Sequence, residues 1–220
     1  MLEVEARRLC QILLDRKSVS PLLNLGSSTS AFRRIEQPYV ERDLFEPLRR
    51  AGIEIVHSDL KAGEGVDVAG DVLDPEVKAA LKARGFKCVL AANLLEHVRD
   101  REAMASACEE IAGPGGLILA TVPSSFPYHA DPGDSGYRPS PGALAAAFGR
   151  SRALLAEELA GPTYKEELRA RGSNFWKAMA ATIVRLPVAW ARPKSFASSL
   201  DRWRWYGRPY RVSIALVRVR

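Results

Sequence analysis

Short apolar runs alternate with segments of helical periodicity along most of this 220-residue chain, and this alternation restricts the fold more than any other feature. The helical segments carry apolar residues at intervals of three and four positions, whereas the apolar runs are short and nearly continuous. Runs of that kind are typical of strands buried on both faces of a parallel sheet. The pattern therefore predicts an open, doubly wound α/β fold with a mostly parallel sheet.

The order of the predicted elements follows from the same pattern. We expect helices, the second of them capped by Asp43, over Leu2–Asp15, Asp43–Arg50, Glu76–Arg84, Arg99–Ala112 and Pro141–Phe148. We expect strands or extended runs over Val19–Leu25, Ile53–His57, Val68–Val72, Lys87–Ala92, Leu117–Val122 and Arg211–Arg220. The composition of Ser151–Leu159 favours a helix. Its position after a helix favours a strand, and we predict a strand there.

The segment from Thr163 to Tyr210 differs from the rest of the chain in composition. It holds all four tryptophans, and the stretch from residue 172 to the end carries ten basic residues against one acidic residue. Residues 1–171 carry 22 basic and 25 acidic residues. We therefore expect one domain over residues 1–220, with 163–210 as a basic, Trp-rich helical insertion before the last strand. The insertion is either a lid over an acceptor pocket, a surface for anionic lipid or a nucleic-acid-binding segment.

Cysteine usage and the N-terminus restrict the class of protein further. Cys10, Cys88 and Cys108 are scattered without ligand spacing, which excludes a disulfide framework and a structural zinc site. The first residues carry charges throughout and lack the apolar stretch of a signal peptide, and no window is long and apolar enough for a transmembrane helix. We expect a cytoplasmic protein, or one peripheral to the membrane, of unknown oligomeric state.

Small and acidic residues follow the predicted strands, at the edge where ligands bind in doubly wound sheets. Gly26 opens a turn of small residues after the first strand, where a ligand can approach the backbone closely. Asp59 follows the second strand and is placed to accept both hydroxyls of a ribose. Asp71 and the amide of Val72 are placed to meet an adenine. The loop has one glycine where the G-x-G-x-x-G fingerprint of dinucleotide binding needs three, so NAD and FAD are disfavoured.

Five segments taken together resemble a known family. LLNLGSS, HSD, VAGDV, CVLAANLLEHV and GPGGLILATVP occur in this order, and they resemble the class I S-adenosylmethionine-dependent methyltransferases, in particular small members with an LEHV turn and a PGG hairpin. The resemblance covers Val19 to about Leu159 and the last strand. It implies S-adenosylmethionine as cofactor and methyl transfer, most simply to oxygen, of a small-molecule, glycan or lipid-linked acceptor.

The resemblance also implies roles for individual residues. The backbone of Gly26 and Ser27 approaches the methionine part of the cofactor, and the carbonyl of Asn93 lies near its ammonium group. Asp59 then holds the ribose, while Asp71 and Val72 hold the adenine. The loop departs from the family pattern of an acid followed by three glycines, because Asn24 replaces the acid and Ser28 and Ser30 replace two of the glycines.

Two histidines are candidates for a base or for orienting the acceptor. His97 lies in the LEHV turn, and His129 lies in the loop after the fifth long strand, near Asp131 and Asp134. The run from Asn93 to His97 also resembles the E-x-x-E-H metal site of quinone-biosynthesis methyltransferases, but its first acid is missing and we expect no metal. The rival to an enzyme is a non-catalytic protein of the same fold whose basic aromatic segment binds a membrane or a partner.

Overall fold

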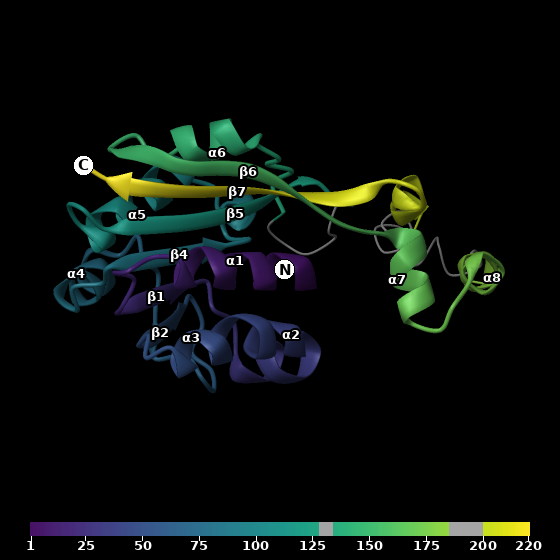
Figure 1. The fold of residues 1–220 in the computed structure, drawn as a ribbon, viewed down its shortest axis with the longest axis horizontal. Coiled ribbons are helices and arrows are strands. Elements are labelled where there is room, and N and C mark those ends of the chain that lie inside the picture. The colour runs from purple at the N-terminus through teal and green to yellow at the C-terminus, as the bar shows by residue number, and fades with distance from the viewer. Residues whose placement is uncertain (128–133, 185–199) are drawn as a thin grey trace.

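The centre of the computed structural model, which describes residues 1–127, 134–184 and 200–220, is a seven-stranded sheet of order β3-β2-β1-β4-β5-β7-β6 (Figure 1). The strands from β3 to β5 in this order run parallel, whereas β7 is antiparallel to both β5 and β6. The strand bounds are β1 Leu22–Leu25, β2 Ile55–Asp59, β3 Val68–Ala69, β4 Cys88–Ala92, β5 Leu117–Ser125, β6 Ser151–Thr163 and β7 Pro209–Val219. The doubly wound, mostly parallel α/β fold is confirmed, and so is the strand predicted from Ser151.

Helices cover both faces of the sheet. Successive side chains of a strand point to opposite faces, so in β4 Val89 and Ala91 join one apolar core while Cys88 and Leu90 join the other. The first core packs against α4 Pro75–Ala83, α5 Arg101–Ala112 and α6 Pro141–Ala146, and the second packs against α1 Glu3–Leu14, α2 Pro38–Val40 and α3 Glu46–Arg50. This two-sided burial is the reason that the strands are nearly continuous apolar runs.

The predicted cap at Asp43 is wrong. The helical stretch begins at Pro38 and continues through a π-helical turn, η2, over Glu41–Phe45, so Asp43 lies inside it. Proline is favoured in the first turn of a helix because its φ is already helical and its missing N–H has no partner there. The Asp43 carboxylate instead accepts from the guanidinium groups of Arg7 and Arg42.

Helices also occupy the segment between β6 and β7. They are α7 Tyr164–Ala170, α8 Phe175–Val184 and the 3-10 turn η5 Arg202–Trp205. In Figure 1 α7 and α8 stand at the far end of β6 and β7, apart from the helices that cover the sheet. The rings of Tyr164 and Phe175 meet Trp203 at 5.5 and 5.4 Å, so aromatic contacts hold the three short elements together. No helix in the described ranges has the length and apolarity that a membrane crossing requires.

The turn at Gly113–Gly116 sets the start of β5 next to the end of β7. The amide of Gly115 donates to the carbonyl of Val219 at 3.0 Å, and the amide of Val219 donates to the carbonyl of Gly116 at 2.9 Å. A Cβ added at Gly116 would lie 2.2 Å from the carbonyl oxygen of Ala112. The backbone must therefore move to accept any side chain at this position.

We expect Gly116→Ala to lower the free energy of unfolding by roughly 2 kcal/mol or more, since the clash is with backbone rather than with a flexible side chain. Gly142→Ala is the matched control, because a Cβ at Gly142 meets nothing within 4 Å and alanine favours helix α6 by about 0.5–1 kcal/mol. Urea denaturation of both variants measures the difference. Equal stability of the two would show that the turn tolerates a side chain.

Candidate functional site

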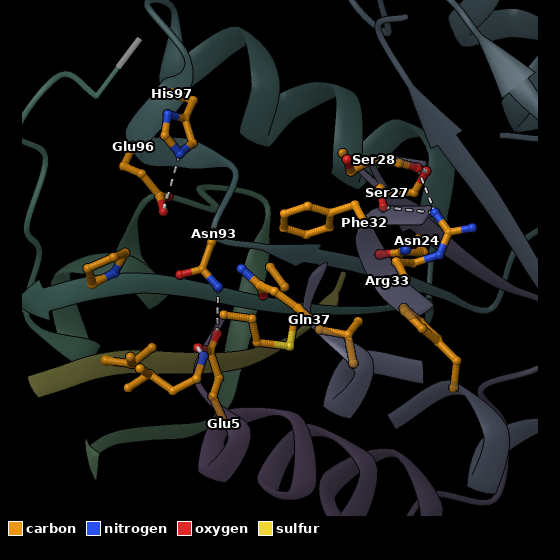
Figure 2. Close-up of a pocket in the computed structure, with 18 of the residues that line it drawn as sticks. Glu5, Asn24, Ser27, Ser28, Phe32, Arg33, Gln37, Asn93, Glu96 and His97 are labelled. Carbon is orange, nitrogen blue, oxygen red and sulfur yellow. Dashed lines mark hydrogen bonds and ion pairs between the residues drawn. The ribbon is translucent and has the colours of Figure 1, made fainter. Parts of the chain in front are cut away.

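A cavity of about 320 Å³ lies over the carboxyl ends of β1, β4 and β5. The strand order reverses between β1 and β4, so the segments that follow these two strands leave in opposite directions and leave a crevice between them. The wall comes from α1, the loop after β1, the π-helical turn η1 Phe32–Glu36, the turn after β4, β5 and β7 (Figure 2). The polar lining residues are Glu5, Asn24, Ser27, Ser28, Arg33, Gln37, Asn93, Glu96 and His97.

The loop after β1 is held in shape by its own backbone. Gly26 has φ +73°, and a Cβ there would lie 3.0 Å from the side chain of Leu94. The amides of Gly26 and Ser27 donate to the carbonyl of Ser58, both at 2.9 Å. Ser28 also adopts a positive φ, 54°, and its amide donates to Oδ2 of Asp59 at 2.7 Å. The amides of these three residues are thus satisfied inside the protein, and the loop offers a small, preformed surface.

Arg33 holds the same loop in place through hydrogen bonds to its backbone carbonyls. Its guanidinium is buried and donates to the carbonyls of Ser27, Ser28 and Gly65 at 2.9, 2.6 and 2.7 Å. A buried charge is tolerated better when its donors are satisfied, and these three carbonyls accept from the two terminal nitrogens, whereas Nε has no partner among the described residues. The sequence analysis did not identify this residue.

Asn24, which replaces the acid of the family pattern, belongs to a buried polar pair. Its side-chain amide lies 3.0 Å from Nδ1 of His57, and Arg49 lies 3.2 Å from Nε2 of the same ring. Burial, together with the nearby Arg33 and Arg49, lowers the pKa of His57 to about 4, so the ring is neutral at pH 7. Asn24 is both part of the cavity wall and an anchor between β1 and β2.

Asn93, at the end of β4, joins the sheet to α1 through Glu5. Its backbone adopts φ 51°, and its amide donates to the carbonyl of Thr121 at 2.9 Å. The Asn93 side chain donates to Oε1 of Glu5 at 2.8 Å, and the Thr121 hydroxyl donates to the same oxygen at 2.6 Å. Oε2 of Glu5 accepts from the amide of Leu2 at 2.9 Å. A fully buried carboxylate is thereby satisfied by three donors.

Glu96 and His97 follow in the short 3-10 turn η3, Leu95–His97. Glu96 is 1% exposed, and its Oε2 has no hydrogen-bond partner in the part of the chain that the structure describes. Its Oε1 lies 3.9 Å from Nε2 of His97, whose side chain is 39% exposed. Burial raises the pKa of Glu96 to about 7. The structure thus places a carboxyl group that titrates near neutral pH in the wall of the cavity.

The residues expected to hold an adenosine lie on the same sheet edge but outside this cavity lining. Asp59 ends β2, and its Oδ1 accepts from the amide of Lys61 at 3.2 Å. Asp71 is exposed and accepts from the amide of Leu73 at 2.9 Å, whereas Val72 is 5% exposed and packs in the core. The structure brings Asn24, Gly26, Ser27, Asn93 and His97 to one cavity and leaves the adenosine set beside it.

His129 and Asp131 lie outside the described residues. Among the residues that the structure does describe, no group of three or more His, Cys, Asp or Glu side chains is placed to hold a metal ion.

The insertion reaches the cavity indirectly, because Phe126 of the wall packs against Tyr210 at 4.6 Å and the Tyr210 hydroxyl donates to Glu167 of α7 at 3.2 Å.

Three charged residues of the cavity wall are not among the site residues predicted from the sequence: Glu5, Arg33 and Glu96. A signal was present for Glu5, because it lies three residues after Leu2 and four before Leu9 on the apolar face of α1. An acid at such a position is buried and needs partners. Arg33 and Glu96 are recognisable only when the loops that surround them are in place.

We expect Glu96→Gln to gain stability relative to the native protein as the pH rises. A carboxyl whose folded pKa lies near 7 stabilises the fold below its ordinary pKa of 4.5, and that stability is lost as the pH rises through 7. The difference in unfolding free energy between variant and native protein should therefore grow by about 3 kcal/mol from pH 4.5 to pH 8.

Chemical denaturation at several pH values measures this difference. Glu110→Gln is the control, because its hydrogen bond to Lys78 lowers the pKa of Glu110 and its pH dependence has the opposite sign. A Glu96→Gln difference that stays constant with pH would contradict a raised pKa at Glu96.

No family model and no curated protein matches the sequence, but the fold matches solved structures over nearly the whole chain. A SAM-dependent methyltransferase from Archaeoglobus fulgidus aligns at a TM-score of 0.56 and 13% identity, covering 98% of this chain and 93% of that one. Coclaurine N-methyltransferase, solved with N-methylheliamine and SAH, aligns at a TM-score of 0.56 and 13% identity, covering 98% of this chain and 70% of that one. The [4+2]-cyclase SpnF aligns at a TM-score of 0.55 and 16% identity, covering 97% of this chain and 81% of that one. This chain therefore has the Rossmann-like fold found in class I SAM-dependent methyltransferases.

Proposed function

We propose that this protein transfers a methyl group from S-adenosylmethionine to a small-molecule, glycan or lipid-linked acceptor, at an oxygen atom. The observation that carries the proposal is the cavity at the strand-order reversal, where the positive-φ loop at Gly26 faces the turn at Asn93. The fold supports it, since methyltransferases share this sheet order with an antiparallel β7. Similarity of fold by itself does not identify a reaction, because the residues of the site determine the chemistry.

The residues present fit this cofactor. Gly26 and the small side chain of Ser27 permit close approach to the backbone, and the buried carboxyls of Glu5 and Glu96 supply negative charge next to a ligand with a cationic methionine end. Asp59 is only partly buried and Asp71 is exposed, so each carboxylate can accept further hydrogen bonds from hydroxyl or amine groups. When bound, S-adenosylmethionine supplies an electrophilic methyl group on a sulfonium.

The residue roles then follow the order along the sheet edge. Gly26 and Ser27 receive the methionine part, Asp59 binds the ribose, and Asp71 with the amide of Val72 binds the adenine. The carbonyl of Asn93 faces the ammonium group. His97, at the cavity wall, orients the acceptor or removes its proton, and we keep His129 as the second candidate for that role.

Two observations favour oxygen over other acceptor atoms. The residues after β4 are Asn93-Leu94-Leu95, without the paired prolines expected for transfer to an amide or base nitrogen. Cys88 is fully buried in β4, and burial raises its pKa to about 12, so it is not a nucleophile for ring-carbon methylation.

We expect calorimetry to detect micromolar binding of S-adenosylmethionine and S-adenosylhomocysteine to the native protein. Asp59→Asn should weaken binding of both about 10-fold or more, because the amide keeps an acceptor for the Ser28 N–H but loses the charge and the paired oxygens. Asp71→Ala should have a similar effect.

Glu54→Ala is the matched control, since it removes an exposed carboxylate just before the amino end of the same strand. Folded native protein that gives no heat with either ligand would contradict the methyltransferase proposal and favour the non-catalytic alternative.

The second candidate is peripheral binding of the insertion to an anionic membrane surface. On α8 the side chains of Trp176, Ile183 and Val184 are 75%, 55% and 75% exposed. Exposed basic residues accompany them in the described part of the insertion, namely Lys177, Arg202, Arg204 and Arg208. Tryptophan and basic side chains together favour the headgroup region of an anionic bilayer. Figure 1 shows α8 at the outer end of the molecule, where it can reach a flat surface.

We expect the protein to bind vesicles of phosphatidylcholine with phosphatidylglycerol and to bind pure phosphatidylcholine vesicles weakly. Trp176→Ala should reduce binding roughly tenfold through the loss of buried apolar area. Leu60→Ala is the control, because Leu60 is an exposed apolar residue (65%) outside the insertion. Co-sedimentation over a salt series measures the affinity. Tighter binding to single-stranded RNA than to the anionic vesicles would contradict a lipid partner, and indifference to both would leave the insertion as a lid.

A further inference from the structure

The charged groups around the cavity do not balance locally. Two carboxyl groups, Glu5 and Glu96, are buried in its wall, and the positive groups of the lining are the buried guanidinium of Arg33 and the amino group of Met1, which acts on Glu96 more weakly than burial does. Arg33 donates to three backbone carbonyls and is not paired with either carboxyl among the described contacts. In Figure 2 Arg33 lies beside Ser27 and Ser28, whereas Glu5 and Glu96 lie on the side of Asn93. The end of the cavity near Asn93 is therefore acidic.

Of the two carboxyls, only Glu5 has its acceptors filled. It accepts from Asn93, Thr121 and the amide of Leu2 at 2.8, 2.6 and 2.9 Å. These contacts come from the residue after β4, from the middle of β5 and from the start of α1. Glu5 is thus a structural group that holds α1 against the sheet, and it has little left to offer a ligand.

The carboxyl group of Glu96, in contrast to that of Glu5, has an oxygen without a hydrogen-bond donor among the described residues. Its Oε2 is buried with no hydrogen-bond partner in the described ranges, and its Oε1 lies 3.9 Å from Nε2 of His97. A buried acceptor without a partner costs free energy, and a buried ionised carboxylate without a counter-charge costs more. Figure 2 shows the Glu96 side chain extending toward the space next to Asn93. A cationic ligand that entered this space would complete the site.

We propose that the Glu96 carboxylate is the counter-charge for the positive centre of the ligand in this cavity, and that this centre is the sulfonium of S-adenosylmethionine. The assignment rests on the proposed function for the identity of the cation. It adds a ligand-recognition residue in place of the acid that the loop lacks at Asn24. It also makes Glu96, rather than the loop backbone, the group that distinguishes the cofactor from its demethylated product, whose sulfur is uncharged.

The titration of Glu96 supports this role. Burial raises its pKa to about 7 and the neighbouring charge of Glu5 adds to this effect, while a hydrogen bond from its own backbone amide, Arg138 and the amino group of Met1 act in the opposite direction. Arg138 is itself paired with Asp134 at 2.6 Å, and the His97 ring is the remaining titratable group beside the carboxyl. Part of the protein therefore carries a proton on Glu96 at pH 7. A cation bound beside the carboxyl favours the ionised form, so binding should release a proton.

The test compares two ligands that differ in charge at sulfur. S-adenosylmethionine and S-adenosylhomocysteine are titrated by calorimetry into native protein, Glu96→Gln and Glu110→Gln at pH 8. We expect Glu96→Gln to weaken S-adenosylmethionine about tenfold or more and S-adenosylhomocysteine less than threefold. Glu110→Gln, which makes the same change in α5 outside the cavity lining, should leave the ratio of the two affinities unchanged.

A second measurement follows the proton. At pH 7, titrations of S-adenosylmethionine in two buffers of different ionisation enthalpy should show release of a fraction of one proton from the native protein. Glu96→Gln should show none, and S-adenosylhomocysteine should release much less.

The outcomes separate this inference from the proposed function. Native binding with the same ligand ratio in Glu96→Gln, or equal weakening of both ligands, overturns the assignment of Glu96 to the sulfonium and leaves the proposed function standing. Failure of the folded native protein to bind either ligand overturns both. A preserved affinity ratio in Glu110→Gln together with a lost preference for S-adenosylmethionine in Glu96→Gln supports the assignment.

Discussion

The buried carboxylate of Glu5 is the interaction on which the cavity depends. It joins α1 to Asn93, which follows β4, and to Thr121 in the middle of β5, and it also accepts from the amide of Leu2. Because α1 crosses the sheet at this point, its first residues close one side of the crevice that the reversal of strand order opens. Without this contact the strand ends would still diverge, but the crevice would have no wall on the side of Met1 and Leu2.

The opposite wall is made rigid in a different way. The loop after β1 has serine at two of the three glycine positions of the methyltransferase pattern that it resembles, yet Ser28 adopts a positive φ, stabilised by the hydrogen bond of its amide to Asp59. Arg33 also donates hydrogen bonds to the carbonyls of Ser27 and Ser28. Serine pays a conformational cost for such a φ, and these contacts offset it. A loop that is bonded internally offers shape to a ligand, whereas the free hydrogen-bonding capacity lies at Glu96.

The sequence was sufficient to predict the sheet, because strands covered on both faces are continuous apolar runs and their ends carry small or acidic residues. Asp43 was misassigned because its carboxylate binds Arg7 and Arg42, a contact that local pattern does not reveal. Five of the predicted site residues meet at the cavity, since the carboxyl ends of neighbouring strands must coincide. The carboxyl group of Glu96 is buried by segments that are distant in the sequence, so the spacing of residues along the chain does not predict its unpaired oxygen.

The same fold supports different chemistry, as the likeness to both methyltransferases and a [4+2]-cyclase shows. The sheet order alone therefore does not select a reaction, and the charges within the cavity carry the argument. A [4+2] cyclisation needs no counter-charge for a cation, whereas a sulfonium cofactor gains from a carboxylate placed in a water-poor site. A buried, unpartnered acid at the strand-order reversal is costly for a protein that only keeps the fold as a scaffold. That cost is offset when a cation binds beside it, and this is the physical reason to favour a cofactor-binding enzyme.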